Sequence, residues 1–170
     1  MAALLWPGLA LACVFPDSSR GSEAPAWVCE PAWPDVALAA VGSRSHMPSI
    51  STQNRIAGRE AMLAVAVAVR SQAREQLEAL AGRPLELSAA PWEDDDLALL
   101  QATPGIRVYA RRRSPGRTLY VLAGVEAERL PPLFASHRRA WLDANAPALR
   151  ELLGDAALAE LRQRAAGEEP

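Results

Sequence analysis

The run from Ser49 to Gly82 constrains the fold most, because it predicts a single, unusually long helix. Apolar side chains recur along it at the spacing that places them on one helical face. They are Met62, Val65, Ala66, Val69, Ala73, Leu77 and Leu80. Most of the charged residues lie on the opposite face, and Gly82 followed by Pro84 is typical of a helix end. Such a helix predicts a partner layer that its apolar face packs across.

The segment "IRVYARRRSPGRTLYVLAGV", residues 106–125, predicts a β-hairpin that turns at Pro115 and Gly116. If Ser114 faces Arg117, apolar residues of both strands share one face. The pairs are then Arg112 with Leu119, Ala110 with Val121, Val108 with Ala123, and Ile106 with Val125. The other face carries Arg107, Tyr109, Arg111, Tyr120 and Leu122. The second strand is nearly all apolar, as in a central strand, and the first is rich in arginine, as in an exposed edge.

A short apolar run from Val36 to Val41 predicts one earlier strand. The order is therefore strand, long helix, strand, strand. In a wholly antiparallel sheet the first strand pairs with the third, which gives the order 1-3-2 with the helix across one face. We therefore predict an α+β fold with a small antiparallel sheet and a helical C-terminal tail over residues 131–170.

The connection over residues 83–104 contains "WEDDDLALLQAT", which predicts a short helix. Glu93, Asp94, Asp95 and Asp96 stand where acidic residues oppose the helix dipole. A calcium site is the alternative, but the run lacks the alternating oxygen ligands and the glycine of an EF-hand loop.

Composition excludes several classes of function. The 170 residues suffice for one domain with appendages, and half of them are apolar. The net charge of −2 argues against nucleic-acid binding, although all 18 basic residues are arginine. Cys13, Cys29, His46 and His137 are the only cysteines and histidines, and their spacing indicates no metal site. We find no catalytic motif and no phosphate-binding loop, so we expect a protein without a cofactor that is not an enzyme.

The N-terminus indicates export. Residues 2–15 are almost wholly apolar, too short to span a bilayer, and a linker-like run, "PDSSRGSEAP", follows. The stretch "LALAC" ends at Cys13 and looks like a lipoprotein signal. We therefore expect a signal over residues 1–12, cleavage before a lipidated Cys13, and a linker over residues 13–26.

Plain export and a cytosolic protein are the alternatives to that anchor. A disulfide between Cys13 and Cys29 is possible only if Cys13 is not lipidated. Otherwise we expect Cys29 to be a small buried apolar residue.

The arginine-rich hairpin tip is the best candidate for a binding feature. It consists of Arg111, Arg112, Arg113 and Arg117, and Tyr109 and Tyr120 are expected to line the sheet face beside it. Guanidinium groups there could meet lipid phosphates or an acidic partner. The simpler interpretation is an edge strand that charge keeps from aggregating.

Four features together resemble the LPP-twenty family, bacterial membrane lipoproteins of about twenty kilodaltons. They are "LALAC", then "PAWV" before a strand ending in "AVG", then the helix "RIAGREAMLAVAVAV", and finally "GRTLYVLAGVEAERL". Similar modules occur in an accessory protein of the flagellar outer-membrane ring. The likeness covers about residues 25–130, implies the same strand–helix–strand–strand fold for a domain over residues 27–130, and carries over no catalytic residues.

The resemblance and the N-terminus together predict a lipid-anchored envelope protein at the periplasmic side of the outer membrane. We expect a structural or protein-interaction role, with envelope or flagellar-ring proteins as partners. The alternative is a soluble periplasmic module that binds a small ligand or an anionic polymer on the sheet face.

Overall fold

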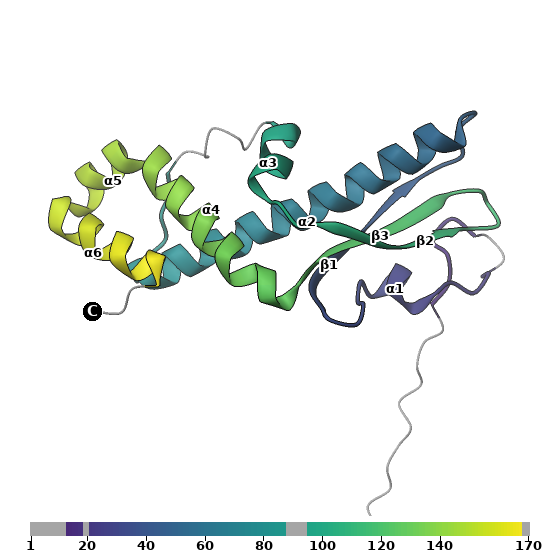
Figure 1. The fold of residues 1–170 in the computed structure, drawn as a ribbon, viewed down its shortest axis with the longest axis horizontal. Coiled ribbons are helices and arrows are strands. Elements are labelled where there is room, and N and C mark those ends of the chain that lie inside the picture. The colour runs from purple at the N-terminus through teal and green to yellow at the C-terminus, as the bar shows by residue number, and fades with distance from the viewer. Residues whose placement is uncertain (1–12, 19–20, 88–94, 168–170) are drawn as a thin grey trace, which may run out of the picture.

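The computed structural model describes residues 13–18, 21–87 and 95–167, so the expected signal over residues 1–12 lies outside the described residues. Figure 1 shows an elongated molecule with a sheet at one end and helices at the other. In chain order the elements are α1 (Ala26–Cys29), β1 (Val36–Arg44), α2 (Ile50–Ala81), α3 (Asp96–Ala102), β2 (Arg107–Arg113), β3 (Leu119–Glu126), a 3₁₀ turn η1 (Ala127–Arg129), α4 (Leu130–Ala144), α5 (Ala146–Leu153) and α6 (Asp155–Ala166).

The predicted fold class is confirmed, because an antiparallel sheet of order β1-β3-β2 lies against one long helix. The central strand β3 is buried from Leu119 to Val125, as its apolar sequence indicates. Alternate residues of β3 point to opposite faces of the sheet, so each face must be covered by something.

Helix α2 covers one sheet face with its N-terminal half. The Ser49 side chain caps it by accepting from the Thr52 amide at 3.3 Å, and Gly82 ends it in the left-handed conformation with φ at 67°. Its buried small and branched residues pack against alternate residues of β3. The core of this layer consists of Ala57, Ala61, Val65, Val69, Leu119, Val121, Ala123, Val125 and Leu133.

The hairpin register differs by one residue from the prediction near the turn. Ser114 pairs with Thr118 instead of Arg117, because Arg117 adopts φ of 66° and adds one residue to the loop. Arg113 therefore lies opposite Leu119. A bulge between Val108 and Ala110 then cancels the shift, so the predicted pairing of Val108 with Ala123 is correct.

The opposite sheet face is covered by the N-terminal part of the chain. The described residues 13–18 and 21–29, which we call the strap, lie beneath the sheet and include α1 (Figure 1). Phe15, Ala24 and Val28 are buried against Tyr120 of β3. The composition of residues 13–26 indicates a linker, but the described part of this segment packs on the sheet.

The C-terminal tail is helical, as predicted, and it packs on the second half of α2 (Figure 1). Leu77 of α2 shares a second core with Trp141, Leu142, Leu149 and residues of α6. Helix α4 joins the two cores, because its Leu133 belongs to the core between the sheet and α2. The tail is therefore continuous with the sheet domain.

Helix α3 confirms the short helix predicted after the acidic run. Asp95 caps it, with one carboxylate oxygen accepting from the Leu97 and Ala98 amides. Glu93 and Asp94 lie outside the described residues. Within the part of the chain that the structure describes, no helix has the length and apolar character to cross a membrane.

Candidate functional site

Cys13 and Cys29 form a disulfide, with their Cα atoms 5.9 Å apart. The bond joins the start of the strap to the end of α1. A sulfur in a disulfide carries no thioether-linked lipid, so the expected anchor and this bond exclude each other on one molecule. The expectation that Cys29 is an unpaired buried residue is wrong for this structure.

Asp17 holds the strap to the hairpin. Its carboxylate accepts from the Ser114 hydroxyl at 2.5 Å and from the Tyr120 hydroxyl at 2.9 Å. The turn residue Gly116 leaves the room for this contact, since a Cβ there would lie 2.7 Å from Asp17 Oδ2. The sequence gives no signal for a contact between residues so far apart in the chain.

The ionisation of Asp17 and Tyr120 follows from this contact. Burial raises the pKa of Asp17, but hydrogen bonds from Ser114, Thr118 and Tyr120 outweigh burial and hold it below its ordinary value. Burial and the Asp17 carboxylate raise the pKa of Tyr120 to about 12. Tyr120 therefore stays protonated and donates to a charged acceptor at neutral pH.

Tyr109 is separate from Tyr120, although both lie on the sheet face away from α2. It contacts Trp33, with ring centroids 6.4 Å apart, and its hydroxyl donates to Glu126 at 3.4 Å. Burial and the Glu126 carboxylate raise its pKa. Because the strap covers Tyr120, which is only 6% exposed, the two tyrosines do not line one open cleft.

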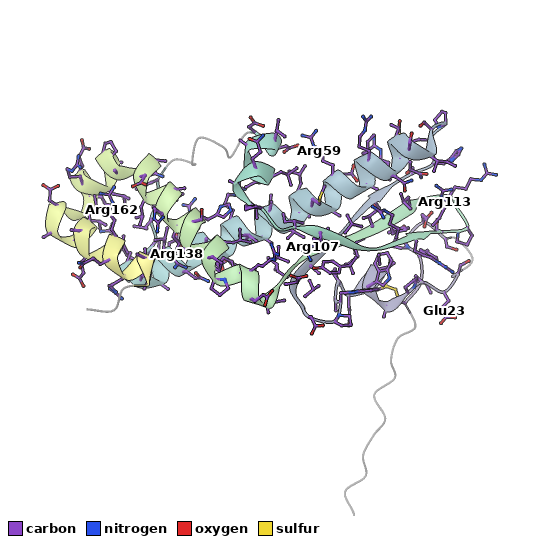
Figure 2. All side chains as sticks on the ribbon, in the orientation of Figure 1. Glu23, Arg59, Arg107, Arg113, Arg138 and Arg162 are labelled. Carbon is purple, nitrogen blue, oxygen red and sulfur yellow. A yellow bond between two sulfur atoms is a disulfide. The ribbon has the colours of Figure 1, made fainter. Side chains whose placement is uncertain are left out.

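The four arginines of the hairpin tip do gather at one end of the molecule, where Figure 2 places Arg113. Paired residues of a sheet share a face, so Arg111 lies on the α2 side with Val121, and Arg112 lies on the strap side with Tyr120. The predicted pairs of Arg112 with Leu119 and of Ala110 with Val121 are therefore wrong, and so are the predicted faces of Arg111 and Arg112. The cause is the added turn residue Arg117. All four are exposed.

Most arginines elsewhere in the described structure contact a carboxylate. These are Arg44, Arg59, Arg74, Arg107, Arg129, Arg150, Arg162 and Arg164. Among the described residues, no carboxylate lies within ion-pair distance of Arg111, Arg112, Arg113 or Arg117. Asp17 lies close to the turn, where it accepts from Ser114, but it forms no ion pair with the four arginines, whose side chains remain exposed.

Gln53 organises this tip and is not among the residues singled out from the sequence. It is fully buried at the start of α2, and its Nε2 donates to the Arg44 and Arg117 carbonyls at 2.9 Å. Its Oε1 accepts from Arg113 Nη2, also at 2.9 Å. A glutamine in line with the buried Ala57, Ala61 and Val65 of the helix is the signal that could have revealed it.

The histidines form no catalytic arrangement with the described residues. His137 is buried, and its Nε2 lies 3.0 Å from the Thr103 hydroxyl. That hydroxyl donates to the Leu99 carbonyl, so it accepts from His137 and is not activated by it. Burial, with a contribution from Arg70, lowers the pKa of His137, while His46 lies exposed before α2.

No metal-binding cluster of three histidine, cysteine or acidic residues occurs in the portion that the structure describes. Comparison with known proteins adds no assignment. No protein-family model matches the sequence, and no curated protein matches it either.

Proposed function

We propose that the chain is an exported protein of the cell envelope that acts by binding a partner and not by catalysis. The observation that carries this proposal is the Cys13–Cys29 disulfide, because disulfides persist in oxidising compartments. The apolar residues 2–15 support export independently. The resemblance to the LPP-twenty lipoproteins supports an envelope location.

The binding role rests on the hairpin tip. The four arginines of the tip are exposed and form no ion pair with a described carboxylate, so their charge is available to a partner. Gln53 holds Arg113 in place, which reduces the entropy lost when a partner binds. A binding cleft on the sheet face is less favoured, because the strap covers Tyr120.

Lipidation of Cys13 is the competing fate of the same sulfur. An anchor would require the disulfide to be absent and the strap to start at a membrane surface. Phe15 lies two residues after Cys13 and is only 3% exposed. Its packing would hold a lipid on Cys13 close to the sheet. The geometry therefore supports an exported protein with the disulfide in preference to the anchored form.

Fractionation and intact mass spectrometry test this proposal. The full chain is produced in a Gram-negative bacterium, and the envelope fraction is analysed with and without reductant. We expect a processed chain that gains two hydrogen atoms on reduction. Free thiols on an unprocessed cytosolic chain would contradict the proposal.

Labelling with a fatty acid separates export from anchoring. The Cys29→Ser variant leaves Cys13 without its partner, and Cys13→Ser is the matched control. Label on the wild type that disappears in Cys13→Ser would establish the anchor and exclude the disulfide form. We expect no label on the wild type.

A further inference from the structure

The outer edge of β2 is an open sheet edge among the described residues, because β2 pairs only with β3. The Ser114 amide donates to the Thr118 carbonyl at 2.9 Å. This bond determines which residues of β2 point their backbone N–H and C=O groups toward β3 and which point them outward. Backbone groups of Arg112 therefore point toward β3, whereas those of Arg111 and Arg113 point outward. Two amides and two carbonyls at the tip have no strand partner.

The bulge limits the length of this edge that another strand can pair with. Between Val108 and Ala110 the register shifts, and Tyr109 turns toward Glu126. Regular strand geometry with outward backbone groups is confined to residues 110–113. An added strand therefore has a short and defined place to pair.

Three of the four residues 110–113 are arginines, and their side chains lie on both faces of the sheet. Arg111 and Arg113 lie on the α2 face, and Arg112 lies on the strap face. A strand added here would place a side chain opposite each of them, within the distance at which cross-strand charge pairs interact. Acidic side chains at those positions would neutralise charge that no described carboxylate contacts.

We propose that the β2 edge binds an acidic, extended segment of a partner protein by strand addition, with main-chain hydrogen bonds to Arg111 and Arg113. This inference rests on the proposed binding function and names its partner. Strand addition takes its affinity from main-chain hydrogen bonds and its specificity from alternate side chains. Lipid phosphates or a polyanion could meet the guanidinium groups, but neither satisfies a row of outward amides and carbonyls.

Peptide binding to the purified full chain tests the proposal. The probe is a fluorescein-labelled peptide with a central Glu-Asp-Glu flanked by valine and threonine. The control is the same peptide with every backbone amide of its central segment N-methylated, which keeps the charge but removes the donors from both edges. We expect the control to bind at least about tenfold more weakly.

Amide exchange measured by NMR locates the contact. In the free protein the Arg111 and Arg113 amides should exchange fast and the Arg112 amide slowly. The peptide should slow the first two and leave the third unchanged. The Arg111→Glu and Arg112→Glu variants should each weaken binding by about tenfold or more, while Arg139→Glu, an exposed change on α4, should not.

Each other result has a defined meaning. Equal binding of the N-methylated peptide would show attraction by charge alone and overturn strand addition. Binding of anionic phosphatidylglycerol vesicles without peptide binding would assign the tip to a membrane, which overturns the inference but leaves the exported binding protein intact. If neither the peptide nor the vesicles bind, the tip is not a binding site; fractionation tests export separately.

Discussion

The Tyr120 hydroxyl group links the central strand to the strap by one hydrogen bond. It donates to Asp17 at 2.9 Å, and its pKa is raised to about 12 from an ordinary value of 10.0. The folded state therefore binds this proton more tightly than the unfolded state does. The stabilisation is complete below pH 10 and is lost as the pH rises from 10 toward 12, by about 2–3 kcal/mol at most. Urea unfolding across this pH range measures it.

The Tyr120→Phe variant is the control for that effect. It keeps the packing of the ring on Phe15, with centroids 5.5 Å apart in the wild type, and removes only the hydroxyl. We expect it to lose about 1–2 kcal/mol at neutral pH and to show a smaller alkaline loss than the wild type. Equal alkaline losses in both proteins would assign the effect to other groups, Tyr109 among them.

Two glycines that face different surroundings should respond oppositely to alanine. A Cβ on Gly42 of β1 would overlap the backbone of Ala57 and Ala61 in α2, whereas a Cβ on Gly58 meets nothing within 4 Å. Gly42→Ala should destabilise by about 2–3 kcal/mol, because the helix must move away from the sheet. Gly58→Ala should stabilise by roughly 0.5–1 kcal/mol through helix propensity.

Thermal and urea unfolding of this glycine pair provide the measurement. If Gly42→Ala does not lower the free energy of unfolding, the close approach of α2 to β1 does not contribute to stability. Both changes add one methyl group, so opposite signs of the two effects would separate overlap at Gly42 from helix propensity at Gly58.

At the scale of elements, the hairpin shows what a sequence pattern can and cannot predict. The apolar content of residues 119–125 was sufficient to place this strand in the centre, and the arginines placed β2 at the edge. The predicted turn is one residue too short, because arginine rarely adopts the left-handed conformation that Arg117 takes. The pattern also gave no sign of the compensating bulge at Tyr109, since a bulge depends on the partner strand.

The packing of the strap on the sheet is not predictable from the sequence, for a different reason. Its proline, serine, glycine and charged residues are typical of a linker, and only Phe15 and Val28 supply large buried groups. What fixes it is distant in sequence: Tyr120 receives the ring of Phe15, and Asp17 reaches Ser114. Composition reports the average character of a segment and not such individual contacts.

The disulfide should determine how firmly the strap is held. It closes a loop with a sequence separation of 16 residues, for which loop entropy predicts about 3 kcal/mol. We expect Cys29→Ser to lose about 2–3 kcal/mol and to become sensitive to protease within the strap, while the sheet stays folded. Limited proteolysis followed by mass spectrometry locates the cuts. Identical stability and cleavage in the variant and the oxidised wild type would contradict this role.

At the scale of the whole molecule, α2 and α4 join two cores. The N-terminal half of α2 packs on the sheet face opposite the strap, and its C-terminal half packs among α4–α6. The long helix and the strand order are predictable from the sequence, because both follow from repeating patterns of apolar residues. The same patterns do not indicate that Leu133 and Trp141, eight residues apart on α4, belong to different cores.

Because two helices span both cores, we expect the molecule to unfold in one cooperative transition. Leu77 is fully buried in the helical core, so Leu77→Ala should lower the free energy of unfolding by about 2–5 kcal/mol. Native-state hydrogen exchange should then show the same loss at amides of β3 as at amides of α5 and α6. Val65→Ala, a smaller truncation in the sheet core, should also lower the protection of both regions equally. Loss confined to α5 and α6 in Leu77→Ala would show that the helical end opens independently and that α2 does not couple the cores.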